Sequence, residues 1–377
     1  MIGLRYISLT GTSGYAQAAR RYLLGLTALG VPVTWTPMVY GNSWGMEFEP
    51  FAGTSLGDPQ LDPICNRDIP YDVVLLHTQP EYYPRLLALL PGKHIAAYTA
   101  WETERVPRSW RSHLAGIDSL IVPCRWNRDV IRAGGFRPPI EVVPHALLPG
   151  QAPAPLESGG SGPFVFYSIN VWDDRKAIDR TLTAYCQAFT ARDAVRFVLK
   201  TSERHVSLRV PFTGWWPFQT RDLAQRLLSR YPDPPPLTLL TQQLPETGIQ
   251  DLHQQGDCYV SLCHAEGWGL GAFDAAASGR PVVMTGYGGQ TEFLSPDLAW
   301  LVRYHMTAPP FRPLMNYEFG HRWAEPDVAQ GAGFLRHVYE NRNESRQKAH
   351  LLATRLCARY RNDRVAAELW DSLGRHL

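Results

Sequence analysis

Short apolar runs that end in turns and lead into helical spacing recur along this 377-residue chain. RYISL at 5–9 is followed by the turn GTSGY and by the helical pattern AQAARRYLLGLTAL, and VPVTWTPM at 31–38 comes next. A strand–helix–strand unit of this kind places its two strands side by side and parallel. The alternation therefore predicts an α/β protein with doubly wound parallel sheets.

The alternation continues to residue 149 and then begins again. In the first half, further strands are predicted at 71–77, 93–102, 119–124 and 141–149, with a helix over 125–133. Residues 41–70 are rich in Gly, Pro and Asp and show no clean period, which is typical of a long loop or an insertion. In the second half, strands are predicted at 164–169, 195–202, 237–244, 257–263 and 280–285, with helices over 176–190, from about Gly271, and within 331–377.

The segment APAPLESGGSGP at 152–163 has the composition of a linker. It separates a first domain, 1–151, from a second domain, 164–349. Both lengths agree with the roughly 100–200 residues that one domain usually holds. Sheets of this kind bind ligands at the carboxyl ends of their strands, so a site is expected there in each domain.

Charge and composition exclude several classes of protein. Lys and Arg number 37 against 35 Asp and Glu, a balance that does not favour a nucleic-acid partner. The six cysteines are scattered without zinc or redox spacing, which indicates reduced thiols. The first residues do not read as a signal peptide, and no run of 18 apolar residues occurs. A cytoplasmic protein is predicted.

The segment 257–292 carries the strongest chemical signal. After a buried strand comes Glu266, then glycines at 267, 269 and 271, then a helix of small residues. Free backbone N–H groups and the positive end of a helix would converge there, which suits a phosphate. Glu266 could meet a sugar hydroxyl or a developing positive charge, and Asp274 could accept from a ribose diol. The neighbours expected to contact the same ligand are His264, Gly267, Trp268, Gly269 and Leu270.

The stretch EGWGLGAFDAAASGRPVV resembles the donor-site motif of retaining GT-B glycosyltransferases, especially family 4. That motif is usually Glu-x7-Glu, and here Asp274 stands in the second place. Other segments resemble the family in the same order along the chain: GTSGY, WETERVPRSW, VVPHALLP, YSINVWDDRKAID and GYGGQTEF. The Glu-x7 segment is the specific one, and the order of the others supports it.

The resemblance implies a GT-B fold, with two Rossmann-like domains facing each other across a cleft and a C-terminal helix of about 350–377 crossing back to the first. A UDP- or GDP-sugar would bind in the second domain without metal or cofactor. In the family an Arg and a Lys clamp the diphosphate. Lys176 matches that Lys, but Val171 occupies the place of the Arg, so Arg175 is the substitute candidate. Lys200 is a third candidate cation, and Leu244 a further donor contact.

The first domain offers weaker candidates. The turn before the first helix would present the amides of Ser13, Gly14 and Tyr15 to the diphosphate, or is simply a tight strand–helix turn. His77 and Glu102 stand at predicted strand ends, where either could take a proton from an acceptor or hold the sugar. Otherwise His77 makes an ordinary hydrogen bond, and Glu102 or Glu104 pairs with Arg105 or Arg108. His145 is a weaker candidate than either.

An arginine-rich stretch between 105 and 137 leaves two interpretations open. Its seven arginines (105, 108, 111, 125, 128, 132 and 137) are interleaved with Trp101, Trp110 and Trp126. Such a face could meet anionic lipid headgroups, a polyprenyl diphosphate or an acidic polysaccharide, with aromatic anchoring. In the alternative, it is a solvated helix face with its tryptophans packed inward. The first interpretation implies peripheral contact of the protein with the inner face of a membrane.

Together these features predict a metal-independent, retaining glycosyltransferase that moves a sugar from a nucleotide sugar to a hydroxyl of a glycan, glycolipid or other acceptor. Bacterial polysaccharide or glycoconjugate assembly is the expected setting. A nucleotide-sugar epimerase or a phosphorylase of the same fold is an alternative, although a phosphorylase is usually longer. A nucleotide-sugar-binding protein without turnover is another. A dehydrogenase is disfavoured because no complete GxGxxG occurs.

Overall fold

The computed structural model describes residues 3–41, 43, 47–153, 162–208, 218–312 and 316–375. Contacts within the chain divide it into two compact units. The first unit holds 1–101, 105–151 and 358–377, and the second holds 102–104 and 152–357. Most of the predicted linker, 154–161, lies outside the described residues.

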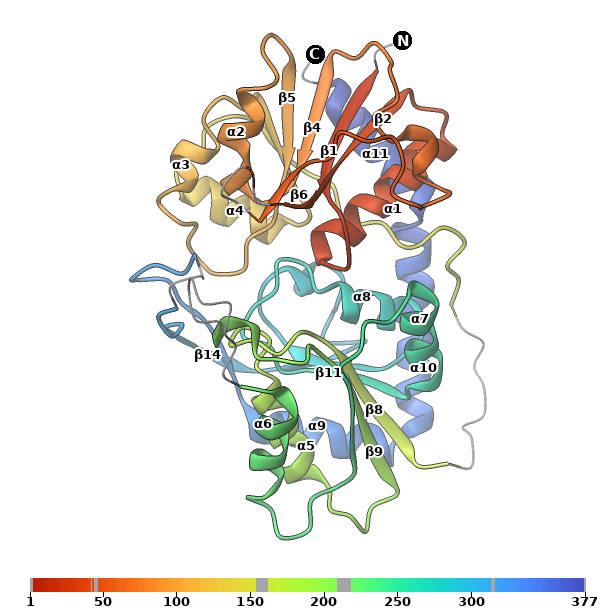
Figure 1. Cartoon of the computed structure of the whole chain (residues 1–377). Coiled ribbons are helices and arrows are strands. Elements are labelled where there is room, and N and C mark those ends of the chain that lie inside the picture. Colours follow the sequence, from red (N-terminus) through yellow and green to blue (C-terminus); the bar gives the residue numbers. More distant parts are fainter. Residues whose placement is uncertain are drawn as a thin grey trace. The chain divides into compact units, whose positions relative to one another are not determined.

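The first unit is built on a seven-stranded sheet with the order β3-β2-β1-β4-β5-β6-β7 (Figure 1). All neighbouring strands are parallel except β2 and β3. The strands are β1 (Leu4–Leu9), β2 (Val33–Tyr40), β3 (Phe48–Pro50), β4 (Val73–His77), β5 (His94–Tyr98), β6 (Ser119–Val122) and β7 (Ile140–Val142). The helices are α1 (Gly14–Ala28), α2 (Tyr83–Leu87), α3 (Trp110–His113), α4 (Arg125–Ala133) and α11 (Asn362–Gly374), with short 3₁₀ turns η1 (Asp62–Ile64) and η2 (Pro80–Tyr82).

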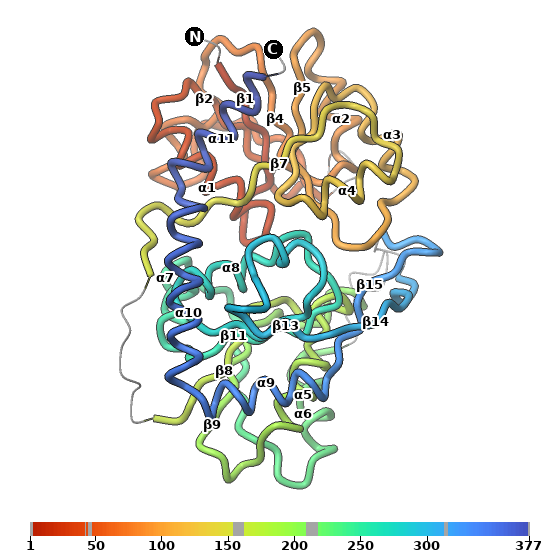
Figure 2. Tube along the Cα trace, turned by 180° about the vertical axis from the view of Figure 1, so that it is seen from behind, coloured from red at the N-terminus to blue at the C-terminus, as the bar shows by residue number. Residues whose placement is uncertain are grey.

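The C-terminal helix α11 packs against α1 (Figure 2). Gly25 of α1 makes this approach close, because a Cβ there would lie 2.5 Å from the Cβ of Ala366. Asn362 at the start of α11 donates from its side chain to the backbone oxygens of Arg21, at 2.9 Å, and Leu147, at 3.1 Å. The helix therefore belongs to the first unit, and the return of the chain begins at residue 358 rather than at about 350.

The second unit has a six-stranded parallel sheet with the order β10-β9-β8-β11-β12-β13. Its strands are β8 (Phe164–Ile169), β9 (Val195–Lys200), β10 (Leu237–Leu240), β11 (Cys258–Ser261), β12 (Val282–Thr285) and β13 (Trp300–Val302). A separate antiparallel pair is formed by β14 (Tyr304–Thr307) and β15 (Trp323–Pro326). The helices are α5 (Ile178–Ala188), α6 (Thr220–Leu228), α7 (Glu246–Gln255), α8 (Leu270–Ala277), α9 (Val328–Glu340) and α10 (Arg342–Arg359), with 3₁₀ turns η3 (Val206–Leu208) and η4 (Gly289–Glu292).

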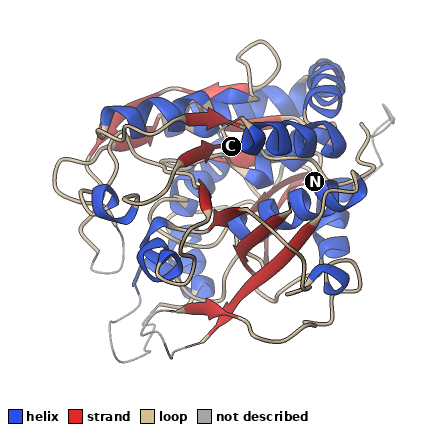
Figure 3. Cartoon of the chain, turned by 90° about the horizontal axis from the view of Figure 1, so that it is seen from above, coloured by secondary structure: helices blue, strands red, loops and turns tan. Residues whose placement is uncertain are grey.

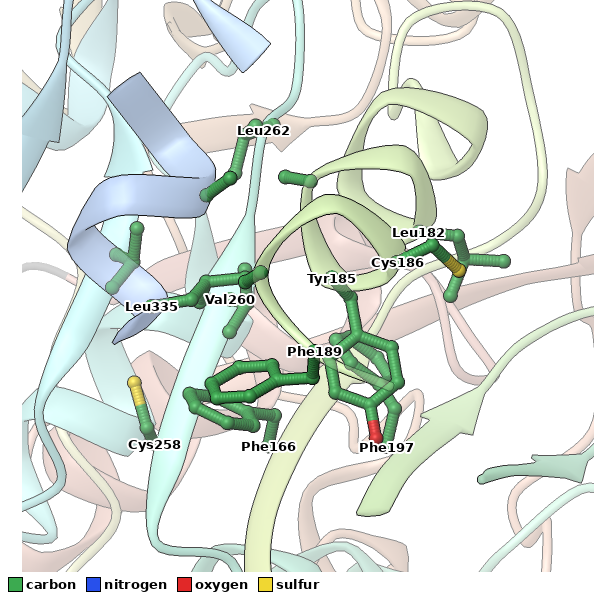
Figure 4. Packing of buried hydrophobic residues seen from close by; sticks show 14 of the residues in the cluster. Phe166, Leu182, Tyr185, Cys186, Phe189, Phe197, Cys258, Val260, Leu262 and Leu335 are labelled. Carbon is green, nitrogen blue, oxygen red and sulfur yellow. The ribbon is translucent and has the colours of Figure 1, made fainter. Parts of the chain in front are cut away.

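One face of this sheet is covered by α5 and α9, and aromatic side chains fill the space between (Figure 4). Tyr185 of α5 and Phe189, which directly follows that helix, both contact Phe166 of β8, at ring distances of 6.0 and 5.2 Å. Leu335 of α9 is fully buried in the same cluster. This packing fixes the central strands, at whose carboxyl ends the charged residues of the unit gather.

The predicted fold class is confirmed: strands and helices alternate along the chain, and the main sheets are parallel apart from one edge pair. Figure 3 shows the helices and strands that make up this α/β fold. Three details differ. The stretch 41–70 adds the antiparallel edge strand β3. The strand predicted over 93–102 ends at Tyr98, which leaves Glu102 in the following loop. The strand predicted over 141–149 ends at Val142. No helix in the described part of the chain is long and apolar enough to cross a membrane.

Candidate functional site

The strand order of the second unit reverses between β8 and β11, its two central strands. Loops that leave neighbouring strands in opposite directions open a crevice at such a switch point, where open α/β sheets bind their ligands. Arg175 and Lys176 lie in the loop after β8, and Glu266 lies in the loop after β11. The topology therefore brings together residues that are about 90 positions apart in the sequence.

The loop after β8 is held in a defined turn. Asp173 accepts a hydrogen bond from the backbone N–H of Lys176 at 2.6 Å, and Arg312 donates to the carboxylate of Asp174 at 2.7 Å. Ala177 then adopts a left-handed conformation, with φ of 46°, immediately before α5. Asp173 and Asp174 therefore stabilise the turn, whereas the side chains of the next two residues, Arg175 and Lys176, are not used for this purpose.

Those two cations converge on one carboxylate. Arg175 Nη1 lies 2.9 Å from Glu266 Oε2, and Lys176 Nζ lies 2.5 Å from Glu266 Oε1. A second carboxylate, that of Glu102, lies 3.8 Å from Arg175 Nε. The side chain of Glu266 is only 7% exposed, so these are largely desolvated ion pairs. Four of the five residues predicted to be catalytic therefore form one cluster.

Burial and charge act differently on the two carboxyl groups. Burial alone would raise the pKa of Glu266, but the ion pairs with Lys176 and Arg175 outweigh it and hold that pKa below its usual range. Burial raises the pKa of Glu102, against the opposing effect of Arg175, and the negative charge of Glu266 adds to the rise. Glu266 therefore stays ionised, whereas Glu102 is the carboxylate of the cluster that gains a proton more easily.

Glycines form the backbone around Glu266. Gly269 takes a left-handed conformation, φ 92°, just before α8, and no side chain of the described residues caps that helix. A Cβ on Gly271 would lie 2.6 Å from the hydroxyl of Tyr259, and one on Gly289 would lie 1.9 Å from the carbonyl oxygen of Gly267. Glycine is thus required for these loops to stack. The start of α8 keeps its N–H groups available to an anion.

His264 ties three segments together. Its backbone N–H donates to the carbonyl of Arg175 at 2.8 Å, and its own carbonyl accepts from Ala324 N at 3.1 Å. Its ring stacks on Trp323 with centroids 4.6 Å apart, and Nδ1 donates to the carbonyl of Ala324 at 2.8 Å. Burial lowers the pKa of this histidine. These contacts give His264 a positioning role between the loops and β15, and its contact with a donor stays a prediction.

The other predicted donor residues of this unit are dispersed. Asp274 is buried on α8, two turns from Gly269, and Leu270 begins that helix. Trp268 is buried, and its ring packs on Phe273 and Phe293, so a contact between its side chain and a donor stays a prediction.

Lys200 ends β9, next to β8, and partial burial lowers its pKa. Its Nζ lies 3.3 Å from the carbonyl of the neighbouring Thr201. Leu244 lies half-buried between β10 and α7, and β10 is the edge strand of the sheet. Neither residue joins the cluster around Glu266.

In the first unit, the turn after β1 is a tight strand–helix connection. Gly11 is left-handed, with φ of 92°, and Ser13 caps α1 by accepting from Ala16 N at 3.2 Å. Gly14 opens the helix, and the hydroxyl of Tyr15 reaches Thr99 Oγ1 at 2.9 Å after β5. These contacts stabilise the turn within its own unit, and its role as a phosphate contact stays a prediction.

His77 is completely buried at the end of β4. Its Nδ1 lies 2.6 Å from the hydroxyl of Tyr6, and its ring contacts that of Tyr98 at 4.3 Å. Burial lowers its pKa to about 3. His145 is buried nearby and stacks on the other side of Tyr98 at 5.7 Å. A neutral imidazole enclosed by tyrosines has no surface with which to meet an acceptor, which favours a structural histidine over a catalytic base.

Sequence analysis missed the β14–β15 hairpin and the true partners of Glu102 and Glu104. The β14–β15 hairpin was not predicted, yet the segment after β14 supplies Arg312 to the turn and Tyr317 to the charge cluster. Burial raises the pKa of Tyr317 well above its usual range, and the charge of Glu102 adds to the rise. The hairpin also anchors 102–104, because Arg322 holds the Glu104 carboxylate at 2.8 and 3.0 Å. Glu102 and Glu104 therefore pair with Arg175 and Arg322, not with Arg105 or Arg108 as the sequence alternative had it.

None of the six cysteines, all of which lie in the described ranges, forms a disulfide. No group of three or more His, Cys, Asp or Glu side chains in the described ranges could hold a metal ion.

A model named Family 4 Glycosyltransferase in conflict systems matches residues 175–369, which begins at Arg175 and includes Glu266 and Asp274. The chain belongs to this family. Its family 4 membership and its GT-B fold agree with the resemblance found in the sequence. No curated protein sequence shows a significant match.

Solved structures with the same fold include other glycosyltransferases. Sucrose-phosphate synthase from Thermosynechococcus elongatus superposes with a TM-score of 0.71 at 14% identity, covering 100% of this chain and 99% of that one. HepE from Anabaena, in complex with UDP-glucose, gives 0.69 at 11% identity, covering 99% and 100%. TarM of S. aureus gives 0.57 at 13% identity, covering 80% of this chain and 54% of TarM. The family 4 chain thus spans about half the length of TarM and of pneumococcal GtfA.

Proposed function

We propose that this family 4 protein transfers a sugar from a nucleoside-diphosphate sugar to a hydroxyl acceptor and that Arg175 and Lys176 hold the diphosphate. The observation that carries the proposal is the convergence of both cations on the two oxygens of a single carboxylate, at 2.9 and 2.5 Å, beside the uncapped start of α8. Two cations that already grip a two-oxygen anion are arranged to grip a diphosphate. Arg175 in this way replaces the arginine that the family usually has at the position of Val171.

The cluster also supports catalysis without a metal ion. A leaving diphosphate gains negative charge in the transition state, and preformed cations in a desolvated site stabilise that charge at little reorganisation cost. The ionised carboxylate of Glu266 now pairs with both Arg175 and Lys176. When the diphosphate takes its place between these two cations, the Glu266 side chain would move toward the sugar. Asp274, on the helix behind, is the proposed partner of the ribose hydroxyls.

Glu102 is the proposed group for the acceptor side of the reaction. Its raised pKa brings it closer to the range in which a carboxylate exchanges protons, and Arg175 links it directly to the diphosphate clamp. Retention of anomeric configuration is proposed on the likeness of the Glu266–Asp274 segment to retaining enzymes. Polysaccharide or glycoconjugate assembly is the proposed setting.

The test is a donor panel. The protein is incubated with UDP-, GDP- and TDP-sugars, with and without chelator, and nucleoside diphosphate release is measured alone and with glycan or glycolipid acceptors. UDP-sugars come first, because HepE and GtfA bind UDP. Release from one donor class, with the product anomer matching the donor by NMR, supports the proposal. Tight donor binding without release would instead indicate a binding protein.

A further inference from the structure

A cavity in the first unit lies outside everything assigned so far. It has a volume of about 570 Å³ and is formed between α3, α4, the loop before α3 and the loops that follow both helices. Its walls are mainly apolar and include Val106, Trp110, Leu114, Ile131 and Phe136. Volumes of this order are typical of small-molecule sites.

The rim of the cavity is cationic. Arg108, Arg111 and Arg137 line it, and no acidic side chain does. Among the described residues, the side chains of Arg111 and Arg137 make no ion pair. The guanidinium of Arg111 lies over the backbone of Gly135, just beyond α4, where a Cβ would be 3.5 Å from Nη2. Positive charge therefore borders the opening from both α3 and the end of α4.

The two acids of this stretch are used elsewhere. Asp118 accepts from the backbone N–H of Ile95 at 2.7 Å, and Asp129 pairs with Arg128 at 2.9 Å. Trp101 and Trp110 are buried, with rings 5.1 Å apart, so they are not available to anchor the surface. Trp126 of α4 is half-buried, so the apolar contribution of this face comes mainly from the cavity.

We propose that this arginine-rimmed cavity binds an anionic lipid at a membrane surface, with the phosphate at Arg111 and Arg137 and part of an apolar chain in the cavity. Charge complementarity requires an anion, and a mainly apolar lining fits methylene groups better than a hydroxyl-rich polysaccharide. The site is separate from the cluster around Glu266, so the proposal does not depend on the proposed transfer reaction.

The test is co-sedimentation of the full chain, without donor, with phosphatidylcholine vesicles that contain or lack phosphatidylglycerol. Each arginine near an anionic surface contributes about fivefold to partitioning, so the double variant Arg111→Gln/Arg137→Gln should bind about 25-fold more weakly. The matched control is Arg221→Gln/Arg226→Gln, which removes two exposed arginines from α6 in the second unit and should bind like wild type.

A second variant tests the cavity rather than the charge. Ala115 is exposed and lines the cavity, so Ala115→Phe fills it without changing charge and should weaken binding about tenfold, the equivalent of two methylene groups. Equal binding to both kinds of vesicle, or an unaffected arginine double variant, would overturn the proposal. So would Ala115→Phe binding like wild type, which would leave only surface charge, or binding to a soluble acidic polysaccharide but not to vesicles.

Discussion

The two units carry the same strand order around their switch points but place different chemistry there. Between β8 and β11, the second unit gathers two cations and two carboxylates into a cluster. Between β1 and β4, the first unit has a capped helix start and His77, which is neutral and enclosed by tyrosines. A shared topology therefore predicts where a site can be, and the polarity of the loop residues decides whether one is built.

The largest expected effect is at the second switch point. Lys176→Ala should lower kcat/KM for the nucleotide sugar by about 30- to 1,000-fold, because loss of one electrostatic donor costs about 2–4 kcal/mol of transition-state stabilisation. Steady-state kinetics would measure it. Lys348→Ala, which removes a half-buried lysine paired with Glu344 on α10, is the control and should leave kcat/KM unchanged. Wild-type turnover in Lys176→Ala would remove the assigned contrast between the units.

At the first switch point the expected effect is on stability. The pKa of His77 is about 3 in the folded unit, against 6.5 for a free histidine, so the unfolded chain binds more protons between these values. Stability of the first unit is therefore fully present above pH 6.5 and falls below it, by about 1.4 kcal/mol per pH unit. When the pH is lowered from 7 to 5, the free energy of unfolding of the first unit should fall by about 2 kcal/mol less in His77→Phe than in the wild type.

Amide hydrogen exchange in β1 and β4 would report the loss for this unit alone. His305→Gln, at an exposed histidine of the second unit, should keep the wild-type pH dependence. A variant at His77 that retains this dependence but loses turnover at pH 8 would reverse our interpretation and make His77 part of the reaction.

A smaller effect is expected on the helix behind the cluster. Asp274→Asn keeps an acceptor but removes a charge, so it should raise KM for the donor about fivefold, or ~1 kcal/mol, with kcat unchanged. Asp371→Asn, on α11 in the first unit, serves as the control. If kcat falls instead, Asp274 contributes to the chemical step and not to ribose binding.

The smallest expected effect is that of chelation. Arg175 and Lys176 supply the positive charge that a diphosphate needs, so EDTA should leave the rate of nucleoside diphosphate release unchanged. Loss of activity that manganese restores would show that the two cations are insufficient by themselves.

The sequence was informative where local patterns determine structure. Apolar runs such as 164–169 and 119–122 predicted the strands, and the spacing from Glu266 to Asp274 predicted the loop and helix around the cluster. Arg175 was identified as the replacement cation because it adjoins Lys176 in the same loop. These inferences depend only on neighbours in the chain.

Other features depend on contacts between distant residues. The burial of His77 results from Tyr6, Tyr22 and Tyr98, which come from three other elements, and a strand-end position does not reveal them. The β14–β15 hairpin has exposed residues such as Tyr304 and His305 on one strand and no clear alternation. Glu102 was predicted at the end of a strand, whereas β5 ends at Tyr98 and Glu102 lies in the following loop. There it pairs with Arg175, which is distant in the sequence, so no local pattern could reveal the contact.

The pairing of α11 with α1 has a consequence for how the chain is made. The hydrogen bond from Asn362 to Arg21 joins residues 341 positions apart. At the usual 5–20 residues per second, a ribosome needs about 20–70 s to synthesise the intervening chain. During that time the second unit is synthesised, and the side of α1 around Gly25 lacks its contact with α11. The second unit can therefore complete its folding before the first unit does, although the first unit begins the chain.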